Sequence, residues 1–319
     1  MITPQLDSAP PTDAARMRFA RTVDRDLVHK WSLTEVFLTD YAAVDDRRYL
    51  TAAQLPVTHG YFNDHAAACE VVDPLLILEV ARQVATYGAH AHSGVPRSAV
   101  LILSSYRLDL VEPVPLDRAA RPAELVASAS VTEQRTRAGR PTTLSFEMRL
   151  SMSDHVVATV DMAVTAMAGD QYHALRVMRR GGEPPTAFDG IGEVGGDRVD
   201  PALVRRFNPA NVVIRGVTAT GDGTSALLDP GCYANRSMFD HPYDHVPAMV
   251  LTEAARQVTV IGADVDTAAI RGLSGRFAAF AELDSAVRVS TAARGGAGRI
   301  EVTATQHDRT VADIAIVVD

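Results

Sequence analysis

The amino-acid sequence predicts an α+β protein made of two successive halves, each with one long buried helix and an antiparallel sheet. The first observation behind this prediction is a repeated motif, Glu-x-x-Arg-Gln, at positions 79–83 and 253–257, an offset of 174 residues (253 − 79). Both copies lie in mostly apolar segments of helical length, which is typical of buried helices. Each copy also precedes several runs rich in Val, Thr and Ile that alternate in polarity like strands. Such repetition indicates a duplicated structural unit.

The first half is predicted to begin with a strand at about Leu27–Leu38, followed by a loop and a helix at about Pro74–His92. This helix carries apolar side chains on nearly every face, which indicates that it is buried. Four long strands are then expected from their polarity alternation, at about Ala99–Val111, Ala123–Gln134, Thr142–Met152 and His155–Ala166.

The second half is predicted to repeat this order of elements. A strand is expected at about Val212–Thr218 and a long apolar helix at about Pro247–Ala263. The strands that follow are expected at about Gly272–Ala281, Ala286–Ala293, Arg299–Gln306 and Thr310–Val318.

One buried helix wrapped by one long antiparallel sheet is the hot-dog fold, so we predict a tandem double hot-dog. Its two sheets are expected to join edge to edge, which makes the chain an internal pseudo-dimer. We place a mobile tail at 1–22, the first domain at 23–168 and the second domain at 211–319. The segment between them, 169–210, is rich in Gly, Pro and charged residues and is predicted to be an exposed linker.

Composition excludes several classes of protein. Hydrophobic residues make up 47% and charged residues 22%, as in globular proteins, and a net charge of −8 disfavours nucleic-acid binding. The sequence has neither the ~18-residue apolar run of a membrane helix nor an apolar secretory signal. We therefore expect a cytoplasmic protein with no membrane or nucleic-acid partner. Cys69 and Cys232 are expected to be free buried thiols, and Lys30 is the only lysine.

The repeated motif supplies the first candidate site residues. Its Glu, Arg and Gln are spaced i, i+3 and i+4 and so share one helix face. One interpretation is a structural ion pair, because ionised side chains are rarely buried unless they are paired. The other is a cleft in which these groups meet a polar substrate. The candidate catalytic residues are then Glu79, Arg82, Glu253 and Arg256, and the candidate substrate-binding residues are Gln83 and Gln257.

Four histidines lie in the loops before the two helices: His59, His65, His241 and His245. A loop histidine is more often solvated than catalytic, and we take His59 and His241 as candidates for substrate binding. The HxxxH spacing of 241–245 has no third ligand beside it in the sequence, so no metal is expected. Phosphate-loop, dinucleotide-binding and serine-hydrolase motifs do not occur, and no cofactor is expected.

The segment FDHPYDHVPAMVLTEAARQ, at 239–257, resembles the helix entry of β-hydroxyacyl-ACP dehydratases, in which a histidine and a Pro-Gly precede a catalytic glutamate. The match is incomplete. His241 lies about two residues too close to Glu253, and Ala248 replaces the glycine. The dehydratases also lack the arginine that the motif carries here.

A closer resemblance, across almost the whole chain, is to the AfsA family of γ-butyrolactone biosynthesis proteins. It rests on a series of motifs in the same order, namely Val28-His29-Lys30, Gln54–His59, Asp73-Pro74-Leu75-Leu76, Gln171-Tyr172-His173 with Arg176, Asp244-His245-Val246-Pro247, and both Glu-x-x-Arg-Gln copies. One departure is His59-Gly60, where the family often has His-Pro, and it puts the role of His59 in doubt.

The resemblance implies an acyltransferase that joins a β-ketoacyl chain, carried by acyl carrier protein, to a hydroxyl of dihydroxyacetone phosphate. It points to Glu79 as general base, with a pKa raised by burial, and to Arg256, then Arg82, as the group that binds phosphate or oxyanion. Sequence alone leaves Glu253 with Arg82 equally eligible. The ester product would be a precursor of a butyrolactone, butenolide or furan signal. The alternatives are a hot-dog dehydratase or thioesterase acting on acyl-ACP, or a non-catalytic binder of acyl or butyrolactone ligands. A homodimer of the whole chain is a further possibility.

Overall fold

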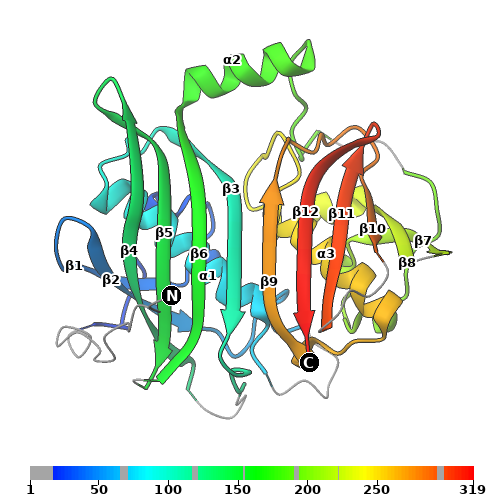
Figure 1. Cartoon of the computed structure of the whole chain (residues 1–319), viewed down its shortest axis with the longest axis horizontal. Coiled ribbons are helices and arrows are strands. Elements are labelled where there is room, and N and C mark those ends of the chain that lie inside the picture. Colours follow the sequence, from blue (N-terminus) through cyan, green and yellow to red (C-terminus); the bar gives the residue numbers. More distant parts are fainter. Residues whose placement is uncertain are drawn as a thin grey trace, which may run out of the picture.

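One antiparallel sheet of twelve strands forms a face of the molecule, and the two long helices pack behind it (Figure 1). The structure is a computed structural model that describes residues 17–64, 71–116, 121–153, 155–189, 194–221, 223–292 and 298–319. The strand order is β1-β2-β4-β5-β6-β3-β9-β12-β11-β10-β8-β7, with the first half of the chain at one end and the second half at the other. The predicted tandem double hot-dog is confirmed.

The first half contains helix α1 and six strands. The predicted helix appears as α1 (Pro74–Tyr87), which continues as a π-turn over Gly88–His92. The four predicted long strands are confirmed as β3 (Ala99–Leu110), β4 (Ala123–Arg137), β5 (Arg140–Met152) and β6 (His155–Ala168). Two further strands, β1 (Leu38–Ala43) and β2 (Arg48–Leu55), extend the sheet at its outer edge and were not predicted.

The strand predicted at Leu27–Leu38 is wrong. The segment forms two 3₁₀ turns instead, Arg25–Val28 and Leu33–Glu35. The side chains of Asp24 and Ser32 accept hydrogen bonds from backbone N–H groups two residues further on, and this local bonding competes with strand pairing.

The second half repeats the plan with shorter strands. Helix α3 (Ala248–Ala263) is followed by β9 (Ile270–Phe277), β10 (Arg288–Thr291), β11 (Arg299–Gln306) and β12 (Arg309–Val318). Before the helix come β7 (Ile214–Thr220), close to its predicted position, and β8 (Gly223–Leu228), which was not predicted. Each long helix packs on the strands of its own half, as expected.

The two halves join through strands β3 and β9, which pair antiparallel from Ser105↔Arg276 to Asp109↔Gly272. Tyr106 lies in this junction opposite Gly275, where a Cβ would come within 2.6 Å of the tyrosine ring. The Tyr106 hydroxyl is 2.8 Å from the Thr252 hydroxyl on α3, so the first half also contacts the helix of the second. The predicted edge-to-edge union of the sheets is therefore confirmed.

The segment expected to be an exposed linker is partly built into the body. It begins with α2 (Gly169–Arg180), a helix that crosses the top of the molecule in Figure 1. Arg176 on this helix is only 1% exposed, and Arg206 further along is 2% exposed. The helix was missed because it buries an arginine rather than an apolar stripe.

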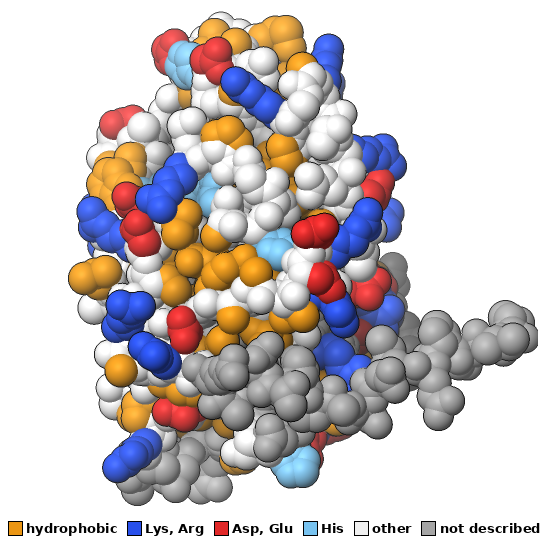
Figure 2. Space-filling view, turned by 90° about the vertical axis from the view of Figure 1, so that its left-hand side faces the viewer, with side chains coloured by type: hydrophobic (Ala, Val, Ile, Leu, Met, Phe, Trp, Pro, Cys, Tyr) orange, Lys and Arg blue, Asp and Glu red, His pale blue; other side chains and the backbone are white. Residues whose placement is uncertain are grey.

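The surface at the β1 end of the sheet shows apolar side chains gathered near its centre, with charged side chains of both signs around them (Figure 2). Among the described residues, no helix has the length and apolar character needed to cross a membrane.

Candidate functional site

A cavity of about 570 Å³ lies between the two halves, on the helix side of the sheet. Strands β3 and β6, helix α2, the end of β9 and the loop before α3 all contribute to its wall. Much of the lining is apolar and includes Leu101, Leu103, Met167, Met249, Leu251 and Phe277. Polar groups gather in two clusters, one at the first repeated motif and one at the loop before α3. Such a cavity, apolar with a few convergent polar groups, is typical of a ligand site.

The first cluster, called here the Lys30 cluster, consists of Lys30, Glu79 and Arg82. Helix α1 presents the glutamate and arginine one turn apart, and the segment between the two 3₁₀ turns brings the lysine to them. Arg82 donates to the two Glu79 oxygens at 2.7 and 2.8 Å, and the Lys30 Nζ is 3.2 Å from Glu79 Oε1. All three residues line the cavity, and the side chain of Arg82 is 20% exposed.

The electrostatics of the Lys30 cluster differ from the expectation. Burial raises the pKa of Glu79, but the charges of Arg82 and Lys30, with hydrogen bonds from Arg82 and Gln83, outweigh it and hold the pKa below its ordinary value. The predicted upward shift of the Glu79 pKa is therefore wrong. Burial lowers the pKa of Lys30, yet attraction to Glu79 raises it overall. The cluster thus has two cations against one carboxylate and suits an anionic or oxyanionic group.

The second copy of the motif has the same internal pairing in a closed environment. Arg256 donates to Glu253 at 2.8 Å and to the Thr267 hydroxyl at 3.0 Å, and Arg206 Nη2 lies 3.2 Å from Glu253 Oε1. The Glu253 and Arg256 side chains are 0% exposed, and among the described residues neither lines the cavity. Burial raises the pKa of Glu253, but Arg206 and Arg256 outweigh it and lower the pKa to about 2. The predicted working pair required Arg256 to lie in the cavity beside Glu79. The structure does not bring Arg256 there.

The motif glutamines, Gln83 and Gln257, connect their helices to the chain segment that precedes each sheet. The Gln83 amide donates to the Glu35 carbonyl at 2.8 Å and accepts from the Phe37 N–H at 3.0 Å. Gln257 makes the equivalent bonds, at 2.7 Å to the Asn211 carbonyl and 2.9 Å from the Val213 N–H. Both side chains are fully buried. Their amides are thus occupied by backbone, and the structure gives no support to the predicted contact with substrate.

The two histidines predicted to bind substrate have different positions. His59 is buried, accepts from the backbone of Tyr61 and Phe62 at 3.2 Å, and contacts Glu35 at 3.3 Å. It does not line the cavity, as far as the described residues show. His241 does line it and stacks on Tyr243, with the ring centres 3.8 Å apart. His65 and Cys69 lie outside the described residues, whereas Cys232 is a buried free thiol as expected.

A second polar group, called here the Asp244 cluster, consists of Tyr172, Arg176, Asp244 and His245, of which all but Arg176 line the cavity. These residues belong to the motifs behind the family resemblance, but none of them was predicted as a site residue. Asp244 lies at its centre and receives hydrogen bonds from Tyr172 at 2.7 Å and from Arg176 at 3.0 Å. His245 Nδ1 is 2.6 Å from the same carboxylate. The available signal was the repeated Asp-His pair in FDHPYDH, but a loop histidine looks solvated until α2 is known to cover it.

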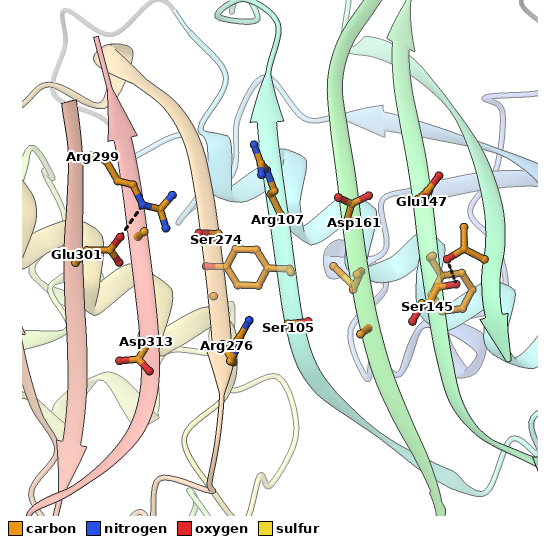
Figure 3. Close-up of a pocket in the computed structure, with 17 residues that line it drawn as sticks. Ser105, Arg107, Ser145, Glu147, Asp161, Ser274, Arg276, Arg299, Glu301 and Asp313 are labelled. Carbon is orange, nitrogen blue, oxygen red and sulfur yellow. Dashed lines mark hydrogen bonds and ion pairs between the residues drawn. The ribbon is translucent and has the colours of Figure 1, made fainter. Parts of the chain in front are cut away.

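A second hollow, of about 470 Å³, lies on the outer face of the sheet across the β3–β9 junction (Figure 3). Its labelled charged side chains are of both signs, and some are paired with close neighbours, such as Arg299 with Glu301 at 2.6 Å and Arg107 with Asp109 at 2.6 Å. Such exposed ion pairs contribute little to the free energy of unfolding, and they do not concentrate charge of one sign. The cavity between the halves is therefore the better candidate site.

Comparison with known proteins gives a consistent result. The profile of the AfsA family, described as an A-factor biosynthesis hotdog domain, matches residues 12–168 and 196–318. A Streptomyces virginiae protein named 2-oxo-3-(phosphooxy)propyl 3-oxoalkanoate synthase is 30% identical over 294 residues, which are 91% of this chain and 95% of that protein. A Streptomyces coelicolor protein with the same name is 28% identical and covers 90% of this chain and 88% of its own length.

Among solved structures, the dehydratase domain from the CurF module of curacin polyketide synthase matches with a TM-score of 0.52. Its identity is 10%, and the alignment covers 88% of this chain and 96% of that domain. At this level the likeness concerns the fold alone, and it agrees with the double hot-dog architecture.

Proposed function

This chain belongs to the AfsA family, and on that premise we propose that it transfers a β-ketoacyl group from a thioester to a hydroxyl of dihydroxyacetone phosphate. The product would be a 2-oxo-3-(phosphooxy)propyl 3-oxoalkanoate, the compound in the names of the relatives. The observation that carries the proposal is the cavity, which combines a cationic polar cluster with apolar walls. The cationic cluster suits the phosphate of a phosphorylated ketone, and the apolar walls suit a fatty acyl chain.

The Lys30 cluster supports a role in binding the phosphate or the developing oxyanion. Of the two motif arginines, Arg82 lines the cavity. Its planar guanidinium can bind two oxygens at once. Glu79 is engaged by Arg82, Lys30 and Gln83 at once, and its role in the proposal is to orient the two cations. The paired Glu253 and Arg256 are assigned to the protein interior. Their proposed contribution is to folding.

The donor and the setting are part of the same proposal. We expect acyl carrier protein to deliver the chain, because thioester-bound β-ketoacyl groups are normally carried in that form during their synthesis. Both substrates are made inside the cell, so the reaction is expected in the cytoplasm. A homodimer of the whole chain would add a second cavity without changing the chemistry, since residues of both halves already meet in one chain.

The test is the dependence of thiol release on dihydroxyacetone phosphate. Purified protein would be incubated with β-ketoacyl thioesters of acyl carrier protein and of coenzyme A, with and without dihydroxyacetone phosphate. We expect free thiol and the phosphorylated ester, detected by mass spectrometry, only when the phosphate is present. Unphosphorylated dihydroxyacetone serves as the matched control and should react much more slowly. Hydrolysis or dehydration at equal rates without the acceptor would identify a thioesterase or dehydratase instead.

A further inference from the structure

Two Asp-His pairs occur four residues apart in the loop before α3, and the structure separates their roles. In the first pair, the distance from His241 Nδ1 to Asp240 Oδ2 is 3.7 Å, too long for a hydrogen bond. The Asp240 carboxylate instead accepts from the backbone N–H groups of Trp31 at 2.6 Å and Ser32 at 3.1 Å. The Asp240 carboxylate therefore holds the backbone at Trp31 and Ser32 in place. It does not orient His241.

In the second pair, His245 Nδ1 lies 2.6 Å from Asp244 Oδ1, within hydrogen-bond distance. Burial raises the pKa of Asp244, but the hydrogen bond and the charge of His245, the hydrogen bond from Tyr172 and the charge of Arg176 outweigh it and lower the pKa overall, so the carboxylate is ionised. An ionised carboxylate can only accept, so the proton between the two groups is carried by Nδ1. This contact engages Nδ1 and leaves Nε2 as the ring nitrogen that Asp244 does not bind. No described residue forms a hydrogen bond with that nitrogen.

The pair is held rigidly. Arg176 donates to Asp244 Oδ2 at 3.0 Å and to the Asp244 carbonyl at 2.8 Å, and it also binds both oxygens of Glu282. The Phe280 ring packs between these groups, 4.9 Å from the His245 ring centre and 4.4 Å from the guanidinium of Arg176. His245 is 24% exposed and lines the cavity, so its ring is fixed and still reachable. A catalytic side chain needs both a fixed position and access for the substrate.

We propose that His245, oriented by Asp244, is the general base of the acyl transfer. This inference rests on the proposed function. Its Nε2 takes the proton from the hydroxyl of dihydroxyacetone phosphate as that oxygen bonds to the thioester carbonyl carbon. The tetrahedral intermediate collapses, the carbon–sulfur bond breaks, and the departing sulfur receives the proton from Nε2. The products are the ester and a free thiol, and the imidazole returns to its starting state.

Glu79 is less suited to the same task. Both of its oxygens accept strong hydrogen bonds from Arg82, and one of them also contacts Lys30 and Gln83. A proton arriving on this carboxylate would have to displace a cation. Both clusters line the same cavity, and so does Tyr243, whose ring centre is 6.2 Å from that of His245. In this proposal, an acceptor whose phosphate is bound at the Lys30 cluster presents its hydroxyl to His245 within that cavity.

The experiment measures thiol release that depends on dihydroxyacetone phosphate in the full chain. His245→Gln should lower kcat by about 10²–10⁴-fold, the usual contribution of a general base, while the melting temperature stays near that of the wild type. His245→Ala should lose activity similarly and regain a measurable part of it when imidazole is added. His241→Ala, the matched variant in the other Asp-His pair, should gain nothing from imidazole. His173→Gln on the exposed face of α2, where the side chain is 60% exposed, should keep wild-type kcat.

The outcomes separate this inference from the proposed function. If the wild type releases no thiol in response to dihydroxyacetone phosphate, the proposed function fails. If the wild type is active and His245→Gln keeps its kcat, the inference alone is overturned. A folded His245→Ala that is inactive and gains nothing from imidazole also overturns it, because the histidine would then act through structure rather than as a base.

Discussion

The two copies of the Glu-x-x-Arg-Gln motif form the same bonds but have different surroundings. In the first copy Glu79 is also paired with Lys30, and Arg82 is partly exposed to the cavity. In the second copy Glu253 is paired with Arg206, and every member is buried. Residue spacing gave an ion pair in each copy as one of two interpretations. It could not show which copy is open, because the residues that close the second copy come from distant parts of the chain.

This difference predicts that replacing the motif glutamate by glutamine has different effects in the two copies. Glu253→Gln would leave the two buried arginines Arg206 and Arg256 with Asp73, 3.4 Å from Arg206, as their remaining carboxylate among the described residues, and it should lower the free energy of unfolding by about 3–5 kcal/mol. Glu79→Gln leaves cations that reach the cavity, so it should cost less stability and mainly raise the KM for dihydroxyacetone phosphate. Urea denaturation and steady-state kinetics on both variants check this. Equal losses of stability would show that both copies are purely structural.

At the scale of single elements, the sequence was most informative where one physical pattern dominated. Strands β4 and β5 alternate in polarity, and helix α1 is apolar on nearly every side, so their positions were predicted to within a few residues. The predicted strand at 27–38 failed because capping side chains at Asp24 and Ser32 favour turns. Helix α2 was missed because its buried contact is an ion-pair network made with Asp244 and Glu282, which no local pattern reveals.

Helix α2 should depend on Arg176 far more than on Arg180, another of its arginines. Arg176 is buried and binds Asp244 and Glu282, so Arg176→Ala should lower the free energy of unfolding by about 2 kcal/mol and speed amide hydrogen exchange in α2. Arg180 is itself 20% exposed and pairs with Glu282 at 3.0 Å and with the partly exposed Asp284, so Arg180→Ala should cost less than about 1 kcal/mol. Exchange mass spectrometry on both variants is the measurement. Equal exchange in the two would mean that other contacts hold the helix.

For the whole molecule, the buried carboxylates predict sensitivity to acid. The pKa of Glu253 is about 2 in the folded protein against an ordinary 4.5, and the pKa values of Glu79 and Asp244 are lowered as well. The unfolded chain therefore binds more protons than the folded one as the pH falls. This contribution to stability is complete above about pH 4.5 and decreases toward pH 2. Urea unfolding measured across this range should show the decrease, and Glu253→Gln should make it smaller. A stability that is flat with pH would refute the ion-pair assignment.

The union of both halves in one chain, through strands β3 and β9, removes a constraint that two separate subunits would obey. In a symmetric dimer every substitution appears twice, so a change that improves one position is imposed on its equivalent. Covalent fusion lifts this symmetry. In each half an Asp-capped 3₁₀ turn ends at a left-handed residue, and the residue that follows pairs with the motif glutamate. This residue is Lys30, which lines the cavity, in the first half and the buried Arg206 in the second. Fusion thus allows the two copies to specialise. One copy is free to change in favour of ligand binding, and the other is retained because its buried ion pairs stabilise the fold.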